Sequence, residues 1–245
     1  MRTSNPALNA KAFERFGPNV AAGEAMTIEG TVNRAGFLLL ILAATATYTW
    51  MRTYAGVAIS GYLWTGILGG FVVALITILK PTLASLTAPI YAALEGLALG
   101  AISAMLEATY HGIVIQSVAL TFGTLFALLI VYRAHLIPVT QKFKLGITAA
   151  TGGIAIFYLI AMALSFFWGI RVPFLHEGSA LGIGFSLFVV VIAALNLVLD
   201  FDFIEQGAAQ GAPKYVEWYG AFGLMVTLIW LYLEILRLLG KLRSR

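Results

Sequence analysis

Seven long stretches of apolar residues, almost free of charge, dominate this sequence of 245 residues. A bilayer core about 30 Å thick requires roughly 20 apolar residues per helix, whereas a membrane-spanning strand requires only about 10 alternating ones. The stretches have the helical length and therefore predict seven transmembrane helices. Their approximate ranges are Gly36 to Met51, Ser60 to Leu79, Ala88 to Leu106, Ile113 to Tyr132, Leu145 to Gly169, Ser179 to Leu199, and Trp218 to Leu239.

The composition excludes an ordinary water-soluble domain. Apolar residues make up 60% of the chain and charged residues 11%, against roughly 45–50% and 25% in soluble domains. This is too little charge to cover a water-facing surface. We predict an all-α integral membrane protein with a cytoplasmic tail at residues 1–34, a seven-helix domain at residues 35–240 and a short basic tail at residues 241–245.

The N-terminal tail has neither a long apolar segment nor a cleavage site of small residues near its start, so we interpret it as part of the mature protein. Within it, Pro6 to Phe16 has apolar residues on one helical side and basic residues on another. This pattern is typical of a short helix at the membrane surface. A tail without regular structure is an equally good interpretation.

Lys and Arg residues indicate orientation, because cytoplasmic connections carry an excess of them. With seven crossings and the N-terminus inside, nine of the fifteen basic residues would be cytoplasmic and six external. If the last stretch were re-entrant, so that both ends were cytoplasmic, the division would be thirteen to two. The rule favours the second arrangement, but the last stretch is long enough to cross. We therefore predict seven helices and leave the side of the C-terminus open.

Glycines at short spacing predict where helices pack closely, because small residues let two backbones approach each other in lipid. Gly96 and Gly100 are four residues apart, as are Gly178 and Gly182, and a further cluster lies at residues 66–70. We interpret these positions as packing surfaces. The functional alternative is a glycine-lined permeation path.

Two acidic residues lie inside predicted spans, Glu95 in the third and Glu234 in the seventh. An acid at the centre of a membrane helix costs about 2.5–3.5 kcal/mol, which makes each a secondary candidate for a functional site. The alternative interpretation of Glu95 is a structural one, in which a protonated or hydrogen-bonded glutamate holds two helices together. Glu234 is either a buried acid of a central helix or an interfacial residue drawn toward the headgroups by Arg237 and Lys241.

Three more acids, Asp200, Asp202 and Glu205, follow the sixth stretch. In a continuing helix Asp202 and Glu205 share a face, while Asp200 points elsewhere. Closely placed carboxylates favour a shared proton or a bound divalent cation. We identify Asp200 and Asp202 as the candidate ion or proton site. The alternative is a solvated turn at which the helix leaves the membrane.

Other functional classes lack their sequence signatures. Cysteine is absent, which excludes disulfides and thiolate chemistry. The Gly-x-Ser at Gly184 to Ser186 has no histidine placed as its base: His111 and His135 lie on no obvious membrane-helix face and His176 lies in a loop. Zinc-protease and phosphate-binding motifs are absent. The basic residues flank helices, so nucleic acid is not a predicted partner. We expect no catalytic residues, no resident metal and no cofactor.

The apolar layout, the Asp-containing end of the sixth span and the last span, Ala221 to Gly240, together resemble the Bax inhibitor/YccA family of seven-helix membrane proteins. The segments Ser4 to Leu8 and Asp200 to Glu205 are similar to its actinobacterial-type branch. The resemblance covers essentially the whole membrane region. It implies a central seventh helix surrounded by the other six.

Some members of that family act as pH-sensitive calcium leak pathways gated by one aspartate from helix six and one from helix seven. An ungapped comparison places the helix-six aspartate at Asp202, or at Asp200 after a small shift, and the helix-seven aspartate at Thr227. Threonine can hydrogen-bond a carboxylate but cannot share its charge, so half of the pair is missing. Glu234 lies seven residues further along, on the same face but two turns away.

The resemblance implies a cation or proton leak pathway, with calcium as a candidate transported ion. The alternative is a non-transporting regulator that binds a membrane protease or another membrane protein. Both functions predict a multi-pass protein of the cell membrane, in a bacterial plasma membrane and in contact with the lipid bilayer.

Overall fold

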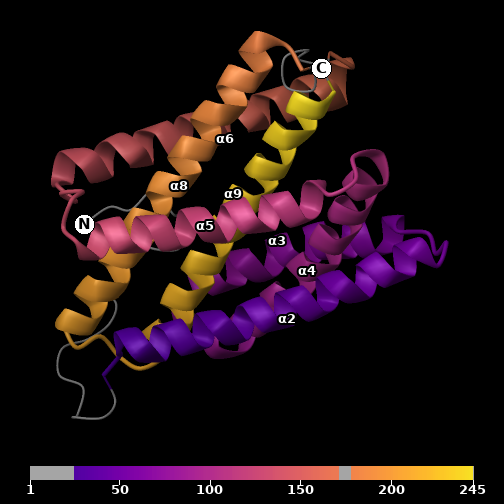
Figure 1. Ribbon diagram of the computed structural model, residues 1–245. Helices are drawn as coiled ribbons and strands as arrows, with labels where there is room; N and C mark the ends of the chain where they lie inside the picture. Colours follow the sequence, from indigo (N-terminus) through magenta and orange to yellow (C-terminus); the bar gives the residue numbers. More distant parts are fainter. Residues whose placement is uncertain (1–24, 171–177, 245) are drawn as a thin grey trace.

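The computed structural model describes residues 25–170 and 178–244, which form seven long helices (Figure 1). Each of the seven is long and apolar enough to cross a bilayer, which confirms the predicted all-α membrane fold. A short 3₁₀ turn, η1 (Pro81–Leu83), precedes the third of them. The helices are α2 (Ile28–Tyr54), α3 (Ser60–Leu79), α4 (Ala84–Thr109), α5 (Ile113–Arg133), α6 (Gln141–Trp168), α8 (Ala180–Ala209) and α9 (Val216–Arg243).

The helix ends differ from the predicted ends mainly where charged residues continue a helix. α2 begins at Ile28, before the predicted Gly36, because the Thr27 side chain caps it by accepting the Gly30 N–H at 2.9 Å. α8 continues past the predicted Leu199 to residue 209. The acids after the sixth apolar stretch therefore belong to a helix and do not form a turn. The amphipathic segment predicted in the N-terminal tail, and His176, lie outside the described residues.

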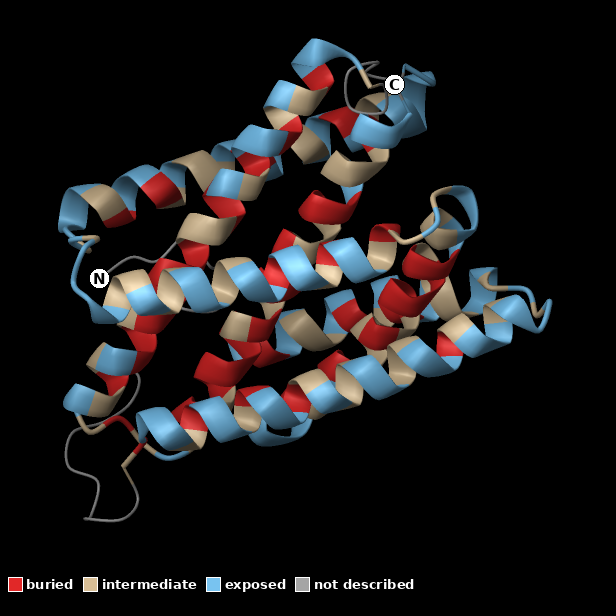
Figure 2. Cartoon of the chain, viewed as in Figure 1, coloured by how far each residue is buried: buried red, intermediate tan, exposed pale blue. Residues whose placement is uncertain are grey.

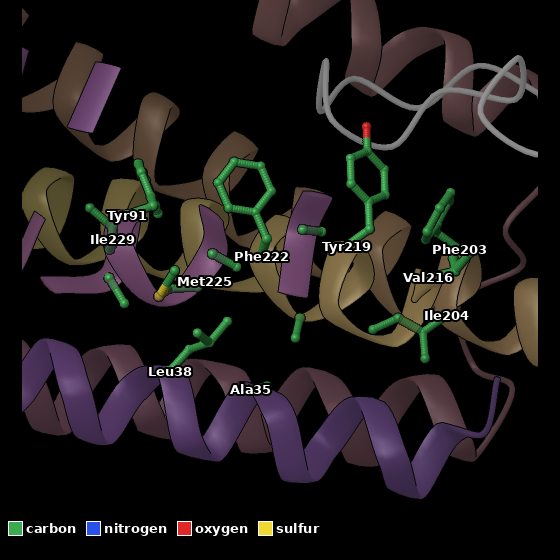
Figure 3. Close-up of a cluster of buried hydrophobic side chains, with 14 of the residues drawn as sticks. Ala35, Leu38, Tyr91, Phe203, Ile204, Val216, Tyr219, Phe222, Met225 and Ile229 are labelled. Atoms are coloured by element: carbon green, nitrogen blue, oxygen red, sulfur yellow. The ribbon is translucent and has the colours of Figure 1, made fainter. Parts of the chain in front are cut away.

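The last helix, α9, lies at the centre of the bundle, as expected. It packs against α2, α4, α5 and α8, and a larger share of its apolar window is buried than in any other described span. Its aromatic and apolar side chains contact a cluster shared with α2, α4 and α8 (Figure 3). In that cluster the rings of Tyr91 and Phe222 meet edge to face, with centroids 5.0 Å apart.

The outer faces of the bundle are apolar and exposed. Figure 2 shows exposed residues along the outer sides of α2, α5 and α6. They include large side chains such as Leu40, Ile115 and Phe166. Such a surface is stable only against lipid tails, so the chain is a multi-pass membrane protein embedded in the bilayer.

Glycines set the contact between α2 and α4. A Cβ atom on Gly96 would meet the carbonyl oxygen of Leu42 at 2.5 Å, and one on Gly100 would collide with the backbone of Ala46. Both glycines are buried. The prediction of a packing surface at this pair is confirmed.

α9 is one unbroken helix of 28 residues, about 42 Å long at 1.5 Å per residue. It contains no turn at which a re-entrant segment could reverse. Its C-terminal basic residues are occupied within the protein, since Lys241 and Arg243 donate to backbone carbonyls of Gly182 and His111. The side of the membrane on which the C-terminus lies stays open, as in the prediction.

Candidate functional site

Asp200 is completely enclosed, with an exposed fraction of 0%. It lies on the face of α8 that also carries Leu197 and Phe203, which pack in clusters with residues of α9. Nine residues separate it from the end of the helix at residue 209, a distance of about 13 Å along the axis. The first predicted site residue thus lies at the interface between α8 and the central helix.

Asp202 faces α6 instead. Its carboxylate forms an ion pair with Nζ of Lys144 and accepts a hydrogen bond from the Gln206 amide at 2.6 Å. The Lys144 side chain is only 4% exposed. The second predicted site residue is therefore neutralised by a buried lysine, which the sequence pattern had indicated only as a helix flank.

Glu205 interacts with a third helix, because Tyr132 of α5 donates a hydrogen bond to its carboxylate. The carboxylates of Asp202 and Glu205 therefore bond to two different helices, α6 and α5, and Asp200 is buried on another side of α8. Within the described residues, no group of three acidic or histidine side chains is arranged to hold a metal ion. Asp200 is fully buried, Asp202 is half-buried, and the two carboxyl groups have different surroundings. Their role as an ion or proton site stays a prediction.

Thr227, the position that matches the family's helix-seven aspartate, is buried on α9 with 3% exposure. Its hydroxyl donates to the carbonyl of Gly223, one turn back in the same helix, at 3.3 Å. Glu234 does not take its place, because it lies about 10 Å further along the axis.

Glu234 is a buried acid with 2% exposure that is also paired. Arg237 donates to its two carboxylate oxygens at 2.9 and 3.0 Å, and the Tyr158 hydroxyl of α6 donates at 3.2 and 3.3 Å. The burial of Glu234 agrees with the interpretation as a buried acid of a central helix. Its ion pair with Arg237 agrees with the interpretation as an interfacial residue. Lys241 turns to α8 instead, where Ser186 accepts its hydrogen bond at 2.9 Å.

Glu95 is half-buried between α4 and α3. A Cβ atom on Gly70 of α3 would approach its carboxylate oxygen to 2.7 Å. The carboxylate therefore fits into the space that this glycine leaves open. Its hydrogen bond is with Tyr91, one turn earlier in the same helix, so a role of Glu95 in joining two helices stays a prediction.

Glu217, at the start of α9, is a fully buried acid that was not predicted from the sequence. It forms ion pairs with Arg34 of α2 and with Lys214, whose Nζ lies at 2.9 Å. The backbone N–H and hydroxyl of Thr27 also donate to it, at 2.8 and 3.0 Å. Sequence spacing holds no signal for this cluster, because Thr27 and Glu217 are 190 positions apart.

Comparison with known proteins agrees with this architecture. The family model described as Bax inhibitor 1 like matches residues 5–244, nearly the whole chain. No curated protein and no solved structure matches the chain significantly. The match covers all seven helices and the acids on α8 and α9, and this chain therefore belongs to the Bax inhibitor 1 like family of membrane proteins.

Proposed function

We propose that this protein is a leak pathway for protons or small cations in a bacterial plasma membrane, with Asp200 and Asp202 as its site. The observation that carries the proposal is the complete burial of Asp200 inside the helix bundle. An acid inside a membrane bundle is expensive and commonly marks an ion pathway or a proton relay. The resemblance to pH-sensitive leak pathways supports the same function.

The site differs from a pair of aspartates on facing helices. Thr227 supplies a hydroxyl where the family has a second acid, and Lys144 neutralises Asp202. Asp200 is therefore the group on which transport depends most, and Asp202 tunes it through its lysine.

The test is flux through the purified protein in proteoliposomes, measured with internal calcium and pH indicators across a range of external pH. Asp200→Asn should lower the flux about tenfold, the effect of losing roughly 1.4 kcal/mol of interaction with the crossing ion. Asp202→Asn should change the pH dependence of the flux. Glu29→Gln removes an exposed acid of α2 and serves as the control. Robust flux that neither aspartate variant alters would refute the site, and a folded wild-type protein without flux would favour the regulator function.

A further inference from the structure

One side of α6 carries a polar residue every seven positions: Lys144, Thr151 and Tyr158. Seven residues make almost two full turns, so the three side chains share one face of the helix. Lys144 is buried and the other two are half-buried. Ala149 and Ile156 lie between them in sequence and are exposed on the outer side. The polar side of α6 is therefore turned toward the bundle.

Each of these residues bonds to a polar side chain of α8 or α9. Lys144 pairs with Asp202. Thr151 accepts a hydrogen bond from the Asn196 amide at 2.8 Å. Tyr158 donates to Glu234 and accepts from Arg237 at 2.6 Å. Together these contacts form a series of polar pairs along the surface where α6 meets α8 and α9.

The pairs lie at successive depths of the bundle. Seven residues correspond to about 10 Å along a helix, so the α6 residues extend over about 21 Å. A fourth contact, from Lys241 to Ser186, continues the series toward the opposite end of α8. The polar groups therefore span most of a hydrocarbon core about 30 Å thick.

The charges along this series favour protons over calcium. Each acid already has a basic partner, Lys144 for Asp202 and Arg237 for Glu234. Calcium requires six to eight oxygen ligands and would compete with these cations for the carboxylates. Protons need only hydroxyl, carboxyl and amine groups with water between them, and the series supplies such groups.

We propose that the polar surface between α6 and α8–α9 is a hydrated path along which protons cross the membrane. This proposal rests on the proposed leak function and identifies its ion and a route that passes Asp202. Asp200, buried two residues earlier on another side of α8, would act on the route from beside it. The competing explanation is that the same hydrogen bonds merely hold three helices together, as polar pairs do in many membrane bundles. The two explanations differ in water access.

Water access is measurable because the wild-type chain has no cysteine. Thr148→Cys and Thr151→Cys place thiols on the proposed path, and Ala149→Cys places one at the same depth on the outer face. A small, membrane-impermeant methanethiosulfonate reagent reacts with thiolates, which form in water and not in lipid. Each of the two path thiols should react with the reagent at least about tenfold faster than the thiol on the outer face. Slow reaction of both in well-folded protein would overturn the path.

Flux of protons tests conduction separately. Tyr158→Phe removes the hydroxyl between Glu234 and Arg237 and should lower proton flux severalfold, with little calcium flux in any variant. Tyr232→Phe is the matched control, because its hydroxyl bonds Ser103 of α4 away from the path. Equal loss of proton flux in the two variants would overturn the path.

The two measurements distinguish failure of the proposed route from failure of the proposed leak function. Proton flux with slow labelling of both path thiols would overturn this route alone, because protons would then cross elsewhere. Fast labelling without flux of any ion would overturn the proposed leak function.

Discussion

The cluster around Glu217 allows a quantitative test of what holds α2 to the central helix. Glu217→Gln keeps the shape of the side chain and an oxygen that can accept from Thr27. It removes the negative charge that compensates Arg34 and Lys214. The two basic groups then remain close together without an acid between them.

The expected loss of stability follows from the burial of each partner. Breaking a fully buried ion pair costs about 3–5 kcal/mol. The Glu217 side chain is 0% exposed, but those of Arg34 and Lys214 are 21% and 47% exposed. Water therefore screens part of the uncompensated charge, and we expect a loss of about 2–3 kcal/mol.

The assay is equilibrium unfolding in mixed detergent micelles followed by tryptophan fluorescence. Trp218 is a suitable reporter, because the Arg34 guanidinium lies 5.2 Å from the centre of its ring. Glu29→Gln makes the same substitution at an exposed acid near the start of α2 and should cost no more than about 0.5 kcal/mol.

Equal stability of the two glutamine variants would refute this reasoning. A further check is the double variant Arg34→Gln with Glu217→Gln. Because the residues interact directly, its loss should be smaller than the sum of the single losses by roughly 0.5–3 kcal/mol. Strict additivity would show that the ion pair contributes nothing.

Two further predictions concern helix contacts and ends. Gly100→Ala would force α2 and α4 apart and should lower the free energy of unfolding by about 1–3 kcal/mol; a similar loss in Gly123→Ala, where the added methyl group meets open space, would contradict this. Glu107 accepts the N–H groups of Gly112 and Val114 at 2.5 and 3.1 Å, so Glu107→Ala should cost about 1 kcal/mol. Amide hydrogen exchange at the start of α5 should become faster, and unchanged exchange there would count against a capping role.

The fold was largely predictable because membrane insertion imposes a local rule. A stretch of about 20 apolar residues becomes a helix in lipid wherever it occurs, since its backbone groups must bond to one another. α3 accordingly begins and ends at the predicted residues, Ser60 and Leu79. The rule predicts a helix end less accurately where charged residues near that end form ion pairs inside the protein, as Arg34 does in α2 and Asp202 does in α8.

The candidate site was predictable only as a list of acids. Asp200, Asp202 and Glu234 were identified because a charge in an apolar stretch is conspicuous. Arg237 was identified as a neighbour of Glu234, but the partners on other helices were not, because Lys144 lies at the edge of its span and Tyr158 is an ordinary aromatic residue in an apolar sequence. The seven-residue spacing of the polar positions on α6 was the available signal.

The sequence by itself determined the seven spans, the membrane environment and the acids that had to be accommodated, because hydropathy acts over a few turns of one helix. Only the tertiary structure decided which helix each acid faces. The contacts of Asp202 with Lys144 and of Glu234 with Tyr158 join residues 58 and 76 positions apart. Such pairs depend on the rotation and packing of whole helices around α9, which no local pattern specifies.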